Sequence, residues 1–152
     1  MKSIEVNNRE IFKVMNLAFE NNQTFILRVR GTSMFPLLKD KKDSVRLAPI
    51  NGELKKRDIV LYRRTNGAYV MHRIIKIKGD VYSMVGDNQR VIETPIYRNQ
   101  ILAIATHIIK NDKEVEIKKS KKYRLFAWFW CLSLFFRACI LKVIRPLFLK
   151  KG

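Results

Sequence analysis

The chain has 152 residues, of which 47% are hydrophobic and 29% are charged, so it is neither a disordered polypeptide nor a polytopic membrane protein. Its length fits one domain with an appendage. The formal net charge of +18 indicates an anionic partner, either nucleic acid or an anionic membrane surface. Residues 110–152 hold 12 Lys and Arg against 3 Asp and Glu and also contain the longest apolar run, which favours a membrane over nucleic acid.

The first predicted element is a short amphipathic helix within residues 1–24. Ile11, Met15 and Phe19 are spaced four residues apart over residues 8–20, which is the spacing of one helix face. The helix is too short and too charged to span a bilayer. The charged residues of this segment lie where a signal peptide would need an apolar core, so we expect no signal peptide here.

From residue 25 the pattern changes to short strands. Asn66-Gly67 is typical of a β-hairpin turn between two of them. The pattern predicts a mainly β domain over residues 25–117, folded as a coiled antiparallel sheet or a partly closed barrel, with the short helix before it and a hydrophobic helix after it. The predicted strands cover residues 24–30, 44–50, 58–64, 69–78, 80–85, 100–110 and 114–119.

Residues 118–152 are both basic and apolar, and we expect this segment to associate with a membrane. Its twelve uncharged residues, 125–136, would span about 18 Å as a helix, which is short of the roughly 30 Å hydrocarbon core. An interfacial helix with Trp128 and Trp130 at headgroup depth therefore fits better than a simple spanning helix. Two alternatives stay open: a tilted span in which Arg137 snorkels, and a helix that caps the β domain.

Three polar residues in chain order supply a hydroxyl, an imidazole and a carboxylate that could act together as a nucleophile, its base and an orienting partner. Ser33 follows the first predicted strand, His72 lies inside the strand 69–78, and Asp87 is on a tight Gly-Asp-Asn turn. A serine hydroxyl becomes a good nucleophile only when a neighbouring base takes its proton, and neutral His72 is suited to that role near pH 7. Asp87 on the other ring nitrogen would fix the tautomer and stabilise the imidazolium.

The residues around Ser33 suggest where the oxyanion of the reaction would bind. Gly31 and Thr32 precede the serine and allow backbone N–H groups to approach it, and Met34 follows it as a positioning residue and apolar wall. Lys76 and Lys78 share a strand face with His72 and are the fallback bases. We expect no metal ion and no cofactor.

These stretches resemble a known family. The motifs "SMFP", "RDIVLY", "HR" and "GDN" are similar to those of type I signal peptidase and its relatives, including the self-cleaving SOS repressors, over roughly residues 25–110. A histidine before the arginine resembles the Ser/His branch of archaea and the endoplasmic reticulum. The resemblance implies Ser33 as nucleophile, His72 as general base and Asp87 as its partner. Arg57 stands where the family usually has Gly, and the family's usual N-terminal membrane anchor is not seen.

The resemblance implies a membrane-associated serine endopeptidase that cleaves a signal or leader peptide. Its expected partners are a protein or peptide precursor and an anionic membrane, the latter through residues 118–152. The cytoplasmic face of the membrane is favoured because no signal peptide is found. Two alternatives stay open. One is a non-catalytic basic β module that binds membrane or nucleic acid, and the other is a cytoplasmic, self-cleaving, repressor-like regulator.

Overall fold

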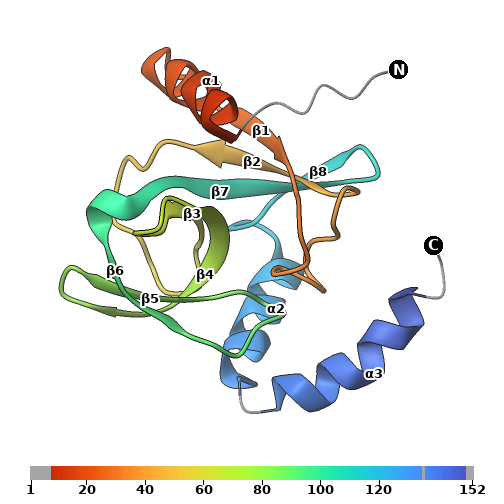
Figure 1. Ribbon diagram of the computed structural model, residues 1–152. Helices are drawn as coiled ribbons and strands as arrows, with labels where there is room; N and C mark the ends of the chain where they lie inside the picture. Colours follow the sequence, from red (N-terminus) through yellow and green to blue (C-terminus); the bar gives the residue numbers. More distant parts are fainter. Residues whose placement is uncertain (1–7, 135, 150–152) are drawn as a thin grey trace.

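The computed structural model describes residues 8–134 and 136–149 (Figure 1). Helix α1 (Asn8–Glu20) comes first, eight strands follow, and α2 (Lys121–Leu132) and α3 (Arg137–Leu149) end the chain. The strands are β1 (Phe25–Arg28), β2 (Ser44–Ala48), β3 (Ile59–Arg63), β4 (Tyr69–Lys78), β5 (Val81–Val85), β6 (Glu93–Tyr97), β7 (Ile101–Lys110) and β8 (Lys113–Glu116), with a short 3-10 helix, η1 (Arg98–Gln100), before β7.

All eight strands belong to one antiparallel sheet. The order is β1-β2-β7-β3-β4-β5-β6, and β8 pairs with β7 beside this path. Strands β1 and β6 are the two ends of the order, so the sheet coils without closing. The predicted mainly β fold with a short N-terminal helix is confirmed.

Most of the predicted elements are confirmed, and one strand was missed. The helix at residues 8–20 and the β3–β4 hairpin around Asn66-Gly67 are present as expected. Strand β6 was not predicted, because Pro95 lies inside it and proline argues against a strand in the interior of a sheet. The structure resolves this conflict by placing β6 at an edge, where no second neighbour needs the missing N–H.

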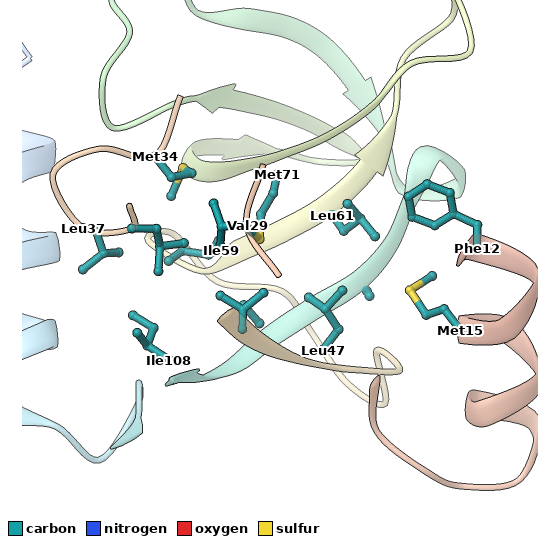
Figure 2. Packing of buried hydrophobic residues seen from close by; sticks show 14 residues of the cluster. Phe12, Met15, Val29, Met34, Leu37, Leu47, Ile59, Leu61, Met71 and Ile108 are labelled. Carbon is teal, nitrogen blue, oxygen red and sulfur yellow. The ribbon is translucent and has the colours of Figure 1, made fainter. Parts of the chain in front are cut away.

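The hydrophobic core consists of two clusters on opposite faces of the β3–β4 pair. Leu61 and Met71 face a first cluster, which α1 extends with Phe12. Figure 2 shows this first cluster between the sheet and α1. Val60 and Tyr62 face the second cluster. The alternation matters for function, because neighbouring residues of β4 project to different sides of the sheet.

The C-terminal apolar segment forms two helices instead of the single hydrophobic helix that we expected. Helix α2 ends at Leu132, and the N–H of the next residue, Ser133, donates to the Phe129 carbonyl over 3.0 Å. Helix α3 begins at Arg137 and extends away from the sheet in Figure 1. The break allows Arg137 to turn back and bury its charge against backbone carbonyls. Among the described residues, no helix is long and apolar enough to cross a membrane.

Candidate active site

Ser33 lies half-buried in the loop that follows β1. Gly31 adopts φ +84°, a conformation that favours glycine, and its N–H donates to Asp40 Oδ1 over 2.8 Å. Met34 is 1% exposed and belongs to the first core cluster. The Leu38 N–H donates to the Met34 carbonyl over 2.9 Å, so the loop is fixed on both sides of the serine.

A pocket of about 430 Å³ opens beside Ser33. Phe12 of α1 stacks on Tyr69 of β4, with ring centroids 3.6 Å apart, and borders the pocket. The walls of the pocket are mostly apolar. They consist of residues 25–30, Ser33 and Met34, Leu61, residues 69–71, and Ile11 and Phe12 of α1.

Two strand edges line this pocket. In the described part of the chain, β1 pairs with β2 alone. Residues 69–72 of β4 pair with β3, whereas the pairing of β4 with β5 begins at Arg73. Both walls therefore offer unpaired backbone groups that can bind a peptide in extended conformation.

His72 lies on the other face of β4, in a buried polar network. Its side chain is 1% exposed, and its Nδ1 is 2.9 Å from the Tyr62 hydroxyl and 3.4 Å from Glu93 Oε1. The Tyr62 hydroxyl donates its proton to Glu93 Oε2 over 2.7 Å. Because that proton is already used, the Tyr62 oxygen accepts from His72, so Nδ1 carries the proton and Nε2 is the basic nitrogen.

The charges in this network are set by burial and by Arg64. Burial lowers the pKa of His72 below its ordinary value, although the charge of Glu93 works in the opposite direction. Burial alone would raise the pKa of Glu93, but hydrogen bonds from Arg64 and Tyr62 outweigh it and hold that pKa below its usual range. Burial, with Glu93, raises the pKa of Tyr62. The network near pH 7 is thus a neutral imidazole, a carboxylate and a phenol.

Asp87 does not orient His72 in this structure. Its two carboxylate oxygens accept from Arg73 Nε and Nη2 over 2.9 and 2.8 Å, and both side chains are fully buried. Arg73 follows His72 on β4 and therefore projects to the opposite face. Glu93 is the carboxylate at the histidine ring, so the pairing expected between Asp87 and His72 is replaced by Asp87 with Arg73 and Glu93 with His72.

Sequence reasoning missed Tyr62 and Glu93. Tyr62 ends the motif "RDIVLY", to which we assigned no site residue, and Glu93 follows the Gly-Asp-Asn turn outside any quoted motif. The hairpin register puts Tyr62 opposite Val70, on the same face as His72, but the Asn66-Gly67 turn alone does not fix that register. Glu93 carried no signal, because it opens the strand β6 that was not predicted.

The loop that carries Asp87 supports the Ser33 loop directly. The Asn88 N–H donates to the Ser33 carbonyl over 2.8 Å. A Cβ added to Gly86 would lie 2.6 Å from the same carbonyl oxygen, so only glycine allows the two loops to come this close. Asp87 is therefore placed to act on the serine through the backbone and not through the histidine.

Ser33 and His72 both lie beside or on β4, but no hydrogen bond joins them in the described structure. Ser33 shares the pocket with Met71, and His72 is the next residue, on the other side of β4. Thr32 is exposed, and its carbonyl accepts from Phe35 N–H over 3.1 Å. The N–H of Gly31, one of the two residues that we expected to shape the oxyanion site, donates to the Asp40 carboxylate.

The fallback bases lie away from the pocket. Lys76 and Lys78 are exposed in the second half of β4, beyond the residues that line the pocket. Among the described residues, no three His, Cys, Asp or Glu side chains come together to hold a metal ion.

A comparison with family models shows to which protein family the chain belongs. The model described as Peptidase S24-like matches residues 2–109. The chain belongs to the Peptidase S24-like family. This confirms the predicted resemblance to the superfamily of signal peptidases and self-cleaving repressors. No curated protein matches the chain significantly.

The S24-like match covers the serine loop, the histidine strand and the network at the ring. Ser33, His72, Asp87 and Glu93 all lie within residues 2–109, and the fold is of the serine-peptidase type. Helices α2 and α3 lie beyond the match. Any part that these helices play at the site therefore lies outside what the family match describes.

Proposed function

We propose that the protein is a serine endopeptidase in which Ser33 is the nucleophile and His72 the general base. The observation that carries the proposal is the network at the histidine ring, which holds Nδ1 protonated and leaves Nε2 basic. This network lies one residue along β4 from Met71, which borders the pocket that also holds Ser33. Glu93 and Tyr62 orient the ring and stabilise the imidazolium that forms when it takes a proton.

With Ser33 and His72 in these roles, we propose the following steps. Ser33 Oγ attacks the peptide carbonyl carbon while His72 Nε2 takes the hydroxyl proton, and the imidazolium then protonates the leaving amine. Water hydrolyses the resulting ester with the same base. The Ser33 and Met34 amides, which have no backbone acceptor in the described residues, would donate to the oxyanion. Because Ser33 and His72 lie on opposite sides of β4, their hydrogen bond requires the Ser33 loop or this part of β4 to move when substrate binds.

The pocket favours an apolar peptide in extended conformation. Its walls include Phe25, Leu27 and Val29 on one side and Leu61 and Met71 on the other. An extended segment placed between the free edges of β1 and β4 would gain main-chain hydrogen bonds, and its side chains would enter the apolar pocket. A signal or leader peptide has this composition, and we propose such a precursor as substrate.

We further propose that the enzyme works at an anionic membrane surface. Leu125, Trp128, Phe129 and Leu132 recur at helical spacing along α2, and each is at least half exposed. Basic residues Lys121, Lys122 and Arg124 are exposed at the start of the same helix. Aromatic and aliphatic side chains beside exposed cations are typical of helices that lie in the interface of anionic lipid.

The repressor-like alternative has one observation in its favour. Ile11 and Phe12 of the chain's own N-terminal helix border the pocket that contains Ser33. A segment that already lies beside the nucleophile is a candidate for cleavage within the same molecule. Self-cleavage is therefore a second candidate activity, and it has a distinct product, a shortened chain.

The test uses the full-length protein with lipid vesicles and peptides that carry an apolar run followed by small residues. Mass spectrometry of the mixture identifies cleaved peptide and shortened protein separately. We expect cleavage by wild type and by the control Ser83→Ala, and none by Ser33→Ala. Cleavage that survives Ser33→Ala removes Ser33 as nucleophile. Wild type that cleaves neither peptide nor itself favours the non-catalytic basic module.

A further inference from the structure

Helices α2 and α3 bind the backbone of the loop at residues 86–89. Arg137 Nη1 donates to the Gly86 and Gln89 carbonyls, over 3.0 Å each. Trp130 Nε1 donates to the Asp87 carbonyl over 2.9 Å. Two side chains from outside the family match thus satisfy three carbonyls of one short loop. We call Trp130 and Arg137 the C-terminal clamp.

The two members of the clamp also bind each other. Arg137 Nη2 donates to the Trp130 carbonyl over 3.0 Å, and its guanidinium carbon lies 5.3 Å from the centre of the Trp130 ring. Arg137 is 0% exposed and Trp130 only 2%. Burying a cation costs free energy unless several polar groups face it. Here three backbone carbonyls accept hydrogen bonds from Arg137 and offset part of that cost.

The loop that the clamp holds determines the position of the nucleophile. Asn88 N–H and Gly86 contact the Ser33 carbonyl, as described above. Asp87 fixes Arg73, the neighbour of the histidine on β4. A displacement of the loop would therefore move the serine and the histidine strand together. Misplacement of reacting groups by about 1 Å can lower a rate by roughly 100-fold.

We propose that Trp130 and Arg137 are positioning residues of the active site, so that the C-terminal helices complete a site that the family match alone does not contain. This inference rests on the proposed peptidase function. Exposed Trp128 lies on the opposite side of α2 from Trp130, so the membrane-facing and site-facing surfaces belong to one helix. Membrane binding through the Trp128 side of α2 and the position of Trp130 against the loop are therefore physically linked, because one helix carries both residues.

The first experiment compares Trp130→Phe with Tyr97→Phe, a change at an exposed residue of β6, in full-length protein. Phenylalanine keeps the ring beside Phe126 and Arg137 but loses the N–H that binds the Asp87 carbonyl. We expect Trp130→Phe to lower kcat roughly tenfold and to leave KM within about twofold. Tyr97→Phe should change neither. An active wild type with an unchanged Trp130→Phe overturns the inference while the proposed function stands.

The second experiment measures order in the loop without relying on turnover. Arg137→Lys keeps the charge but cannot donate to three carbonyls from one planar group. Mass spectrometry of amide hydrogen exchange should show faster exchange at residues 31–36 and 86–90, and the exposed control Arg90→Lys should not. Unchanged exchange in Arg137→Lys and Trp130→Phe overturns the clamp. Absent cleavage by wild type, in contrast, identifies a failure of the proposed function itself.

Discussion

At the scale of single residues, the tautomer of His72 determines what the site can do. The Tyr62 proton goes to Glu93, the Nδ1 proton goes to Tyr62, and Nε2 is left as the base. The assignment depends on a phenol that stays protonated, and burial raises its pKa in the direction that ensures this. The ring is thus oriented by a tyrosine and a carboxylate together.

The first prediction concerns the pH dependence of cleavage. Burial lowers the pKa of His72 below 6.5, and only the neutral ring accepts a proton. kcat/KM should therefore rise with pH along an acidic limb whose midpoint lies below about 6.5. Glu93→Gln should move that limb to still lower pH, because the carboxylate charge raises the pKa of the ring. A wild-type midpoint at or above about pH 7 contradicts this account.

The second prediction separates the two carboxylates. Asp87→Asn leaves the Arg73 guanidinium buried without its counter-charge, and we expect a loss of about 3–5 kcal/mol in the free energy of unfolding. Glu93→Gln should cost only about 1 kcal/mol of stability but lower kcat at least roughly 100-fold. Urea denaturation and peptide cleavage measure the two effects. The reverse pattern would return the orienting role to Asp87.

The third prediction concerns Arg57, which stands where the family usually has glycine. Its φ is +81°, in the left-handed region, and its side chain is exposed. Arg57→Gly should relieve this strain and raise the free energy of unfolding by about 0.5–1 kcal/mol, after the higher entropy of glycine in the unfolded chain is subtracted. Urea denaturation with an unchanged m-value would confirm it. A destabilised variant would mean that the arginine side chain contributes unseen stabilisation.

At the scale of elements, α2 is apolar on two sides for two different reasons. Its inner side carries Ala127 and Trp130, which are buried against the domain. Its outer side carries Leu125, Trp128 and Phe129, which are exposed. A capping helix and an interfacial helix were both among our expectations for this segment. The packing explains why the run is apolar all round. The inner side caps the domain, and the outer side is the surface that we propose for lipid.

The fourth prediction tests that outer surface. Replacing Trp128 and Phe129 by alanine should lower the fraction of protein that sediments with anionic vesicles at least fivefold, since each exposed aromatic contributes on the order of 1–2 kcal/mol of burial in lipid. The matched control is alanine at exposed Val14 and Leu17 of α1. Wild-type binding should also weaken with salt. Equal sedimentation of all variants removes α2 as the lipid-binding surface.

The β3–β4 hairpin shows why the network at His72 could not be predicted from sequence. Asn66-Gly67 fits loops of two or three residues, and these differ by one residue in register. The structure has Arg64 N–H bonded to the Ala68 carbonyl and Gly67 at φ +86°. This three-residue loop puts Tyr62 on the histidine's face, whereas a shift of one residue would have put Leu61 there.

At the scale of the whole molecule, local patterns predicted the helix and most strands, and they named Ser33 and His72 as the candidate nucleophile and base. What they missed depends on long-range pairing. Glu93 reaches the ring only because β6 pairs with β5, and Arg137 reaches the loop only because the chain reverses after α2. We had interpreted Arg137 as a charge that interrupts a membrane segment. Its burial against backbone carbonyls follows from tertiary contacts that no spacing in the sequence contains.

The central claim is that Ser33 and His72 act as one unit, and a double-variant cycle tests it most directly. The measurement is kcat/KM of full-length protein on the cleaved peptide for Ser33→Ala, His72→Ala and both together. Residues that act in the same step lose activity non-additively, so we predict that the double variant retains the residual activity of either single variant. Losses that multiply in the double variant would show independent roles and would contradict the account.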